Sequence, residues 1–317
     1  MNKKYELLQD HYIKHEGRTL YRIKALRDFG NVKAGDIGGY VQSEDNLSHD
    51  GECWVYGEAK VYDNAYVYHS AKIIGAAEIY QNATVFRNAE ILSYAKVFGN
   101  AKVFGNAEVY GNSKIYGAAK IYDNVRIYDD VEVYGNAFVL DNAEIYDNVK
   151  IYENAGVFGT AHIRDNVEVY GEATVYGHAD VFENAKIYGK AKVTDCARVF
   201  ENTIVCNSAK ITCNAKVFGN AKIEEDTIIG QVSMPYKKIF QYQCKKSIVT
   251  AILTEDDEIL YSIGCQINIT EKEFIDRIHN ASGGLESNPH RKEYLDIIKI
   301  IKIYLQIEEN VRIQECE

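Results

Sequence analysis

A six-residue repeat dominates this sequence and limits what the chain can fold into. From Val55 to Ile229, every sixth residue is valine or isoleucine, at 30 successive positions without an insertion. The residue two places before each of them is small: mostly alanine, otherwise serine, threonine, cysteine or valine. A fixed short period of this kind is typical of stacked repeat architectures, in which each unit contacts only its neighbours.

Each hexad can be interpreted as a short strand followed by a corner. In Ala101-Lys102-Val103-Phe104-Gly105-Asn106, alternation along a strand turns the alanine and valine inward and the lysine and phenylalanine outward. Gly, Asn and Asp tolerate the backbone conformations of a tight corner, and Asn fills the second corner position in 16 of the 30 hexads. One strand cannot bury its inner face alone, so the coils must stack to form a continuous core.

This pattern resembles the hexapeptide-repeat proteins over residues 53–232, more than half of the chain. The resemblance implies an all-β solenoid, a left-handed parallel β-helix with three hexads per triangular coil. Thirty hexads then make about ten coils, and residues 18 apart lie above one another. The sequence departs from the acyltransferases of that superfamily after the aliphatic residue, where 21 of 30 positions are Tyr or Phe.

With these aromatic residues, the repeat resembles the Tyr/Asn-rich hexapeptide proteins of phages and prophages. The flanks resemble the same group, in Lys33-Ala34-Gly35-Asp36-Ile37-Gly38-Gly39-Tyr40, in Gly264-Cys265 and in Thr270-Glu271-Lys272-Glu273-Phe274.

Two segments outside the repeat predict end caps. Residues 1–52 contain an alternating stretch from Thr19 to Leu26 and several turn glycines, and we interpret them as an N-terminal β cap. Residues 233–317 predict a small α+β module. It has a strand pair at 247–253 and 258–264, a helix after the capping box of Thr270 and Glu273, and a second helix from Pro289. The simpler interpretation is that this module only caps the prism, and the alternative is that it recognises a partner.

Charge and composition exclude some classes of function. The net charge is −10 and no segment is strongly basic, which disfavours nucleic acid as a partner. No apolar run of membrane-spanning length and no secretory leader are visible, and the seven cysteines include no CxxC spacing. We therefore expect a cytoplasmic protein, in the host cell if a phage encodes it, without membrane contact.

One outward column is the first candidate for an interface. It runs through eight consecutive coils beside lysines and glutamates that mostly alternate in sign. Its members are Tyr62, Tyr80, Phe98, Tyr116, Tyr134, Tyr152, Tyr170 and Tyr188. A large aromatic stripe favours an interface, and the family resemblance implies a homo-oligomer, a trimer or a dimer. The alternative is that the rings only stabilise the stack, as they would on all three faces.

An acidic corner is a second candidate. Five carboxylates recur 18 residues apart, at Asp129, Asp147, Asp165, Glu183 and Glu201. Columns of oxygen ligands suit calcium, but aspartate is also an ordinary corner residue, and no EF-hand spacing is present. A metal at this corner stays an open hypothesis.

A histidine is the third candidate. We expect His162 to lie outward between Glu144 and Asp180 of the adjacent coils, with Arg164 two residues on. A histidine flanked by acids can act as a general base, and the acyltransferases in the resembled superfamily use a histidine to deprotonate an acceptor. Those enzymes shape their sites with loops that interrupt the repeat, and residues 53–232 contain none. A surface histidine in a charged column is the simpler interpretation.

Two functions follow as hypotheses. The first is a non-enzymatic scaffold that presents ordered aromatic and charged columns to a macromolecular partner, and the phage-like resemblance suggests a host defence or replication protein. The second is a CoA-dependent acyltransferase, with acetyl-CoA as the acyl donor and His162 as the base. The scaffold requires no cofactor. Fold alone does not decide between them.

Overall fold

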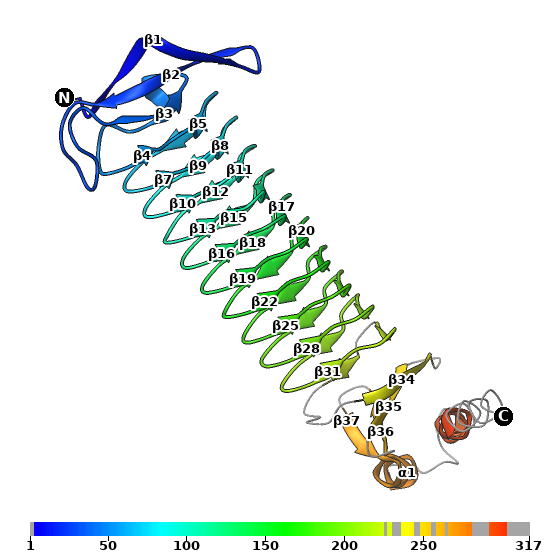
Figure 1. Cartoon of the computed structure of the whole chain (residues 1–317). Coiled ribbons are helices and arrows are strands. Elements are labelled where there is room, and N and C mark those ends of the chain that lie inside the picture. Colours follow the sequence, from blue (N-terminus) through cyan, green and yellow to red (C-terminus); the bar gives the residue numbers. More distant parts are fainter. Residues whose placement is uncertain are drawn as a thin grey trace, which may run out of the picture.

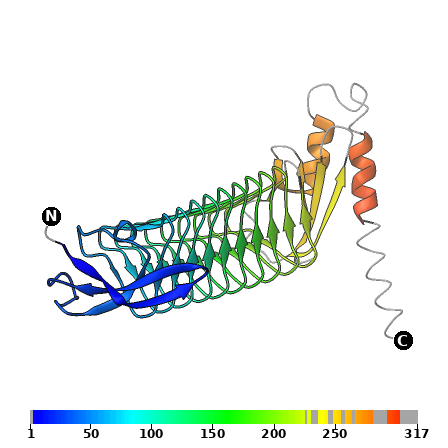
Figure 2. The ribbon, with the colours of Figure 1, turned by 90° about the horizontal axis from the view of Figure 1, so that it is seen from above.

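The computed structural model describes residues 3–224, 227–229, 236–243, 248–254, 258–263, 266–280 and 292–302. Its centre is a parallel β-helix of ten triangular coils, with antiparallel strands at the N-terminal end and a small sheet with two helices at the other (Figure 1). At the usual strand spacing, ten coils make a prism about 48 Å long. No loop interrupts the stack over residues 53–224 (Figure 2).

Three faces make up the prism, and each is named here by a feature of its outward side chains. The tyrosine face carries the eight-ring column and continues into the N-terminal strands in one 13-stranded sheet. Its repeat strands are β5 (Lys60–Val61), β8 (Glu78–Ile79), β11 (Lys96–Val97), β14 (Lys114–Ile115), β17 (Glu132–Val133), β20 (Lys150–Ile151), β23 (Glu168–Val169), β26 (Lys186–Ile187), β29 (Ile204–Val205) and β32 (Lys222–Ile223).

The histidine face carries His162 and is a ten-stranded sheet. Its strands are β4 (Trp54–Val55), β7 (Lys72–Ile73), β10 (Glu90–Ile91), β13 (Glu108–Val109), β16 (Arg126–Ile127), β19 (Glu144–Ile145), β22 (His162–Ile163), β25 (Asp180–Val181), β28 (Arg198–Val199) and β31 (Lys216–Val217).

The lysine face, also ten-stranded, has lysine as its only charged residue type at the outward strand positions. Its strands are β6 (Tyr66–Val67), β9 (Thr84–Val85), β12 (Lys102–Val103), β15 (Lys120–Ile121), β18 (Phe138–Val139), β21 (Gly156–Val157), β24 (Thr174–Val175), β27 (Lys192–Val193), β30 (Lys210–Ile211) and β33 (Ile228–Ile229).

The register confirms the 18-residue period. Lys114 pairs with Glu132, and Ile115 with Val133, in parallel strands one coil apart. Between coils the backbone N–H of one residue donates to the carbonyl 17 residues on, as from Lys114 to Val131 at 2.8 Å. The valines, isoleucines and nearly all the small residues line one continuous core without solvent contact. The alternation predicted from the hexad therefore holds throughout.

The corners follow a stricter rule than the composition suggests. From residue 57 to residue 219, every first corner residue has a positive φ, whether it is glycine, aspartate or a bulkier residue such as Arg87. The frequent asparagines are the second corner residues and are not left-handed. They form ladders in which the side-chain amide of one donates to the next coil, as from Asn106 to Asn124 at 2.9 Å. Asparagine thus links the coils, while the preceding residue makes the bend.

The N-terminal cap begins as a hairpin of β1 (Tyr5–His15) and β2 (Arg18–Ala25). It turns on Glu16 and Gly17, which both have positive φ. Strand β3 (Ile37–Val41) already belongs to the stack, because it pairs in parallel with β5, with Tyr40 opposite Lys60. Tyr40 and Lys60 are 20 residues apart in the sequence, whereas residues in register on neighbouring regular coils are 18 apart. The coil that leads from β3 to β5 is therefore two residues longer than a regular one. The short 3-10 helix Glu44–Asn46 lies within that coil.

The cap closes the open end of the prism. Trp54 occupies an outward position of the first hexad, yet only 1% of it is exposed. The rings of Tyr5 and Phe29 contact it edge-on, with centroid distances of 6.1 and 5.4 Å. Val41 and Leu47, six residues apart, extend the inner core into the cap.

The C-terminal module is an antiparallel sheet of β34 (Tyr236–Gln243), β35 (Ile248–Thr254), β36 (Ile259–Ile263) and β37 (Gln266–Thr270), followed by α1 (Glu271–Asn280) and a helix over 292–302. The capping box is confirmed: Thr270 Oγ1 accepts from the Glu273 N–H at 3.3 Å, and a Glu273 carboxylate oxygen accepts from the Thr270 N–H at 2.8 Å. The predicted strand pair corresponds to β35 and β36, and the sequence reasoning missed β34 and β37. Residues 264 and 265, and the second helix's start at Pro289, fall outside the described residues.

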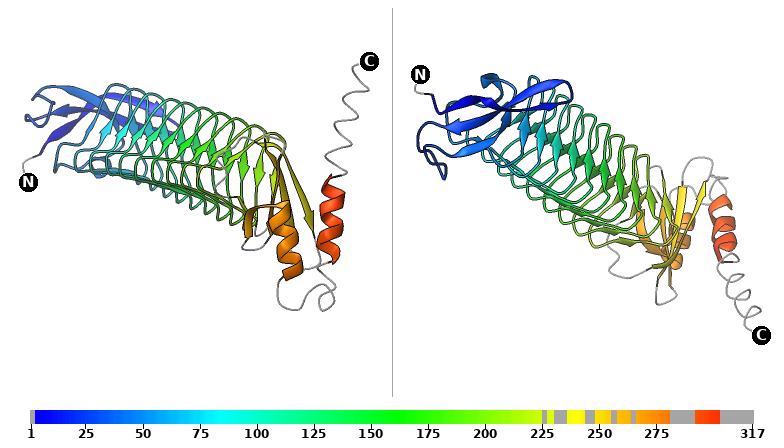
Figure 3. Two further views of the ribbon diagram at one scale, coloured as in Figure 1. Left: turned by 90° about the horizontal axis from the view of Figure 1, so that it is seen from below. Right: turned by 45° about the horizontal axis from the view of Figure 1, so that its top comes forward.

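The two faces of this small sheet pack against different parts of the protein. Ile252 points into the core of the prism and closes its last coil, with Leu260 beside it. The neighbouring Ala251 and Tyr261 face the other way, against the two helices. This alternation places the helices on the side of the sheet away from the coils (Figure 3).

Candidate binding surface

The predicted column of eight aromatic residues forms one unbroken ladder. From Tyr62 to Tyr188, neighbouring ring centroids are 4.8–5.1 Å apart, and the angles between ring planes are 2–10°. The coil spacing imposes this distance, which lies in the range of favourable stacked pairs. The other faces carry shorter runs, such as Tyr110–Tyr128–Tyr146 and Tyr68–Phe86–Phe104–Tyr122. The tyrosine face therefore carries the longest aromatic ladder among the described residues.

The lysines and glutamates beside the ladder neutralise one another. Glu78 lies 3.3 Å from Lys60 and 3.5 Å from Lys96, measured between carboxylate oxygen and ammonium nitrogen. Glu132 and Glu168 each lie 2.9 Å from a lysine, Lys114 and Lys186 respectively. The hydrogen bond from Lys186 holds the pKa of the Glu168 carboxyl below its usual range. Seven of the eight flanking charges are thus paired within the face, Lys150 being the exception among the described residues, and little desolvation of unpaired charge would oppose its burial.

Some tyrosine hydroxyls are tied to the glutamates of the next coil. The Tyr152 hydroxyl donates to a carboxylate oxygen of Glu168 at 3.2 Å. Burial in the ladder, together with Glu132, raises the pKa of Tyr116 to about 12. Both effects keep the phenols protonated and fix the rings in place.

The ladder presents ring edges outward, because each ring's two faces are covered by its neighbours. Nucleobases and sugars bind aromatic residues chiefly through ring faces. An interior rung offers them none, whereas a flat protein surface can pack against a row of edges and hydroxyls. The interior rungs therefore present edges and hydroxyls, with no free ring face for a stacking base or sugar.

The first rung is already covered by the chain itself. Tyr62 has no exposed surface, because Leu20 of the β1–β2 hairpin and Tyr40 of β3 pack against it. The hairpin lies alongside the first coils (Figure 2). Only Tyr80 to Tyr188 remain for an outside partner, so Tyr62 belongs to a contact within the chain.

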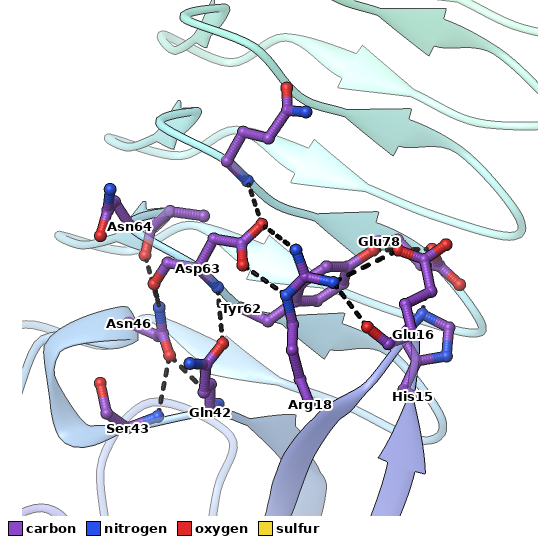
Figure 4. Close-up of polar contacts among 12 residues, drawn as sticks. His15, Glu16, Arg18, Gln42, Ser43, Asn46, Tyr62, Asp63, Asn64 and Glu78 are labelled. Atoms are coloured by element: carbon purple, nitrogen blue, oxygen red, sulfur yellow. Dashed lines mark hydrogen bonds and ion pairs between the residues drawn. The ribbon is translucent and has the colours of Figure 1, made fainter.

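Polar contacts fix the hairpin over this rung (Figure 4). The Arg18 guanidinium donates two hydrogen bonds to the corner carboxylate of Asp63, at 2.5 and 3.1 Å, and its carbon lies 5.2 Å from the Tyr62 ring centre. His15 Nε2 lies 3.6 Å from a carboxylate oxygen of Glu78. Sequence reasoning missed Arg18 and His15, because nothing in the hexad pattern shows that the cap folds back over this face.

A second layer anchors the corner that receives Arg18 (Figure 4). The Asn46 side chain donates to the carbonyls of Asp63 and Ala65, each at 3.0 Å, and accepts from the Ser43 N–H. The Gln42 side chain accepts from the Asp63 N–H at 2.9 Å. These bonds hold the backbone of the first corner in the orientation that Asp63 needs to receive the arginine.

His162 lies where the period predicts, between Glu144 and Asp180 on adjacent strands. Its Nε2 is 3.8 Å from Glu144, and its side chain is 54% exposed. Asp180, however, faces Arg164 at 3.4 Å and Arg198 at 3.2 Å. The structure therefore joins His162 to one acid only.

Arg164 fills the break in its own aromatic column. Its guanidinium carbon lies 4.0 Å from the ring centre of Phe182, in cation–π geometry. Together with the ion pair to Asp180, this contact accounts for the arginine without a catalytic role.

The acidic corner uses several of its carboxylates to bind the backbone. Asp147 accepts from the Asp165 N–H at 3.1 Å, and Asp165 accepts from the Glu183 N–H at 3.0 Å, one coil further on. Asp129 and Glu201 continue the same corner at its two ends, and all five residues have positive φ. Across the part of the chain that the structure describes, no three His, Cys, Asp or Glu side chains are grouped to hold a metal ion.

A shallow polar groove runs along another corner and was not foreseen. Its volume is about 430 Å³, and asparagines and left-handed corner residues line it. The lining residues are Arg87, Asn88, Gly105, Asn106, Asp123, Asn124, Asp141 and Asn142. It has little apolar lining, which sets it apart from ordinary small-molecule sites.

Compared with known proteins, the chain matches no protein-family model and is not significantly similar to any curated protein. Within the described ranges, no helix combines the length and the apolar character that crossing a membrane would require.

Proposed function

We propose that this protein is a non-enzymatic scaffold that binds a macromolecular partner through its tyrosine face. The observation that carries the proposal is the eight-ring ladder, in which most of the flanking lysines and glutamates are paired within the face and the rungs from Tyr80 to Tyr188 stay partly exposed. A second copy of the chain is one such partner, in a dimer or trimer. A host protein is the other.

The sequence resemblance supports a phage or prophage origin, because the Tyr/Asn-rich hexads are similar to the hexapeptide proteins common there. A protein of that origin works in the cytoplasm of the host. A defence or replication factor of the host is then a reasonable class of target, and the acidic net charge is compatible with competition against nucleic acid for such a factor.

The test is to replace Tyr116, Tyr134 and Tyr152 together with serine. All three rings are half-buried outward side chains, so the inner core stays intact. We expect the variant to stay folded while its assembly mass or its set of captured host proteins changes. A folded variant with unchanged mass and unchanged partners would contradict the proposal. The matched control replaces Tyr110, Tyr128 and Tyr146 of the histidine face.

The competing hypothesis is a CoA-dependent acyltransferase with His162 as general base. The contact of His162 with Glu144 favours it, and the absence of any interruption in the coils between residues 53 and 224 opposes it. Calorimetric titration with acetyl-CoA decides between them. Saturable binding, with acyl transfer lost in His162→Ala, would support the enzyme, and absence of binding would leave the scaffold.

A further inference from the structure

We propose that the tyrosine face holds a second arginine-binding site, at Tyr152, Glu153 and Glu168, which receives an arginine-bearing apolar strand of a protein partner. This inference rests on the proposed function and specifies the partner's chemistry. Its basis is internal to the molecule, because the chain repeats one constellation twice on the same face and fills only the first copy.

The filled copy shows what the constellation binds. Asp63 follows Tyr62 at the left-handed corner and takes the Arg18 guanidinium in a two-pronged contact. Glu78, one coil on, accepts from the Tyr62 hydroxyl at 3.4 Å and faces His15. Leu20, two residues after the arginine, packs on the ring. The occupant is therefore strand β2, which pairs antiparallel with β3 and carries a cation and an aliphatic side chain on the same side.

The second copy lies five coils further along the same face. Glu153 follows Tyr152 at a left-handed corner, and Glu168 accepts from the Tyr152 hydroxyl at 3.2 Å. The flanking lysines match as well. Lys60 and Lys96 lie opposite Glu78 on the adjacent strands, as Lys150 and Lys186 lie opposite Glu168. Both lysines form ion pairs with Glu78, and Lys186 forms one with Glu168.

Glu153 is the part of the second copy that stays free. Its side chain is exposed, and none of the described residues lies within ion-pair distance of it. Asp63, by contrast, is engaged by Arg18. An unpaired corner carboxylate beside a half-buried ring is the element that an incoming guanidinium would complete.

No other rung of this ladder carries both acids. The residue after Tyr116, Tyr134, Tyr170 and Tyr188 is glycine, and the one after Tyr80 is glutamine. On the histidine face, Tyr128, Asp129 and Glu144 repeat the pattern, but Arg126 and His162 flank that glutamate. The tyrosine face alone repeats the whole arrangement, lysines included, in the same sheet as the occupied copy.

The two copies differ around the ring and in the backbone. Tyr62 ends the ladder, so Arg18 and Leu20 can lie against it, and their strand β2 pairs with β3 at the end of the sheet. Both faces of Tyr152 are covered, by Tyr134 at 5.0 Å and Tyr170 at 4.8 Å. An arginine at the second copy is therefore held by Glu153 and by the ring edge, and we expect weaker binding there than at the first copy.

The experiment uses the full chain and a cyclised peptide that copies residues 11–22 of the hairpin, with a fluorescent label. Binding is followed by anisotropy. We expect one site per chain, loss of binding when the peptide carries Arg18→Gln, and at least tenfold weaker binding to the chain variant Glu153→Gln. The control variant Glu172→Gln changes a nearby exposed corner acid and should bind as the wild type does.

Two results would overturn the inference: no binding of the peptide to the wild-type chain, or equal binding by the wild type and Glu153→Gln. In the second case, loss of binding in Asp129→Asn would place the site on the histidine face. If the peptide fails to bind while the triple tyrosine variant still changes mass or partners, only the partner chemistry is wrong. If the peptide binds through Glu153 while that triple variant behaves as the wild type, the arginine site stands and the broader scaffold proposal fails.

Discussion

The first corner residue of each hexad decides whether the chain can turn. Its backbone is left-handed at every described corner of the repeat up to Gly219. For an L-residue other than glycine, that conformation costs roughly 1–2 kcal/mol, and asparagine and aspartate are the best tolerated. The stack nevertheless accepts glutamate, arginine and cysteine there, because the ladder bonds on either side hold the corner.

Substitutions at Gly105 and Gly17 distinguish the cost of a left-handed backbone from the cost of a steric clash. Both have positive φ, +81° and +79°. A β-carbon at Gly105 would lie 2.5 Å from the Asp123 nitrogen, whereas one at Gly17 would meet nothing within 4 Å. We expect Gly105→Ala to lower the free energy of unfolding by about 2–4 kcal/mol and Gly17→Ala by about 1 kcal/mol. Urea unfolding measures both, and equal losses would show that the corner yields without strain.

Titration of the tyrosine hydroxyls tests whether the rings of the ladder are packed. The folded pKa of Tyr116 is raised to about 12 from an ordinary value of 10.0. The protonated phenol is therefore favoured in the folded state. The resulting stability is complete below pH 10 and is lost as the pH rises from 10 to 12.

We expect the ladder tyrosines to contribute their tyrosinate absorbance late in this range, together with unfolding, and the rise to be smaller in Tyr116→Phe. Titration of all the tyrosines near pH 10 with the fold intact would contradict the packed ladder.

Among the larger elements, the C-terminal sheet contributes to stability by closing the last coil. Ile252 is fully buried and belongs to the core of the prism rather than to that of its own module. Ile252→Ala should cost about 2–4 kcal/mol through the cavity it leaves. Ile275→Ala, at a partly buried position on α1, is the control with a smaller loss. Thermal unfolding measures both, and a negligible effect of Ile252→Ala would mean that the sheet does not seal the coils.

The sequence revealed these elements to different degrees. The period of six predicts every repeat strand, because one aliphatic residue in each hexad must enter the core. The capping box predicted the start of α1 from Thr270 and Glu273 alone. Strands β34 and β37 were missed, since their pattern is no clearer than that of a loop. The early coil of Val41 and Leu47 was also missed, because its two extra residues break the period.

At the level of the whole molecule, the ladder was predictable and its first occupant was not. A period of 18 places eight rings in one column, and the structure confirms each neighbouring contact. Whether a segment outside the repeat covers part of that column depends on the direction in which the hairpin folds. Only the three-dimensional structure shows Arg18 on Asp63. That contact indicates that the unpaired carboxylate of Glu153 could bind an arginine in the same way.

If the exposed rungs of the tyrosine face are the contact surface, hydroxyl-radical footprinting of the unmodified protein will detect their protection. The protein is labelled dilute, concentrated and after addition of host lysate. We expect oxidation of Tyr116, Tyr134 and Tyr152 to fall in the concentrated sample or with lysate, while Tyr128 and Tyr146 on the histidine face stay unchanged. Equal oxidation of both faces under all three conditions would contradict the account.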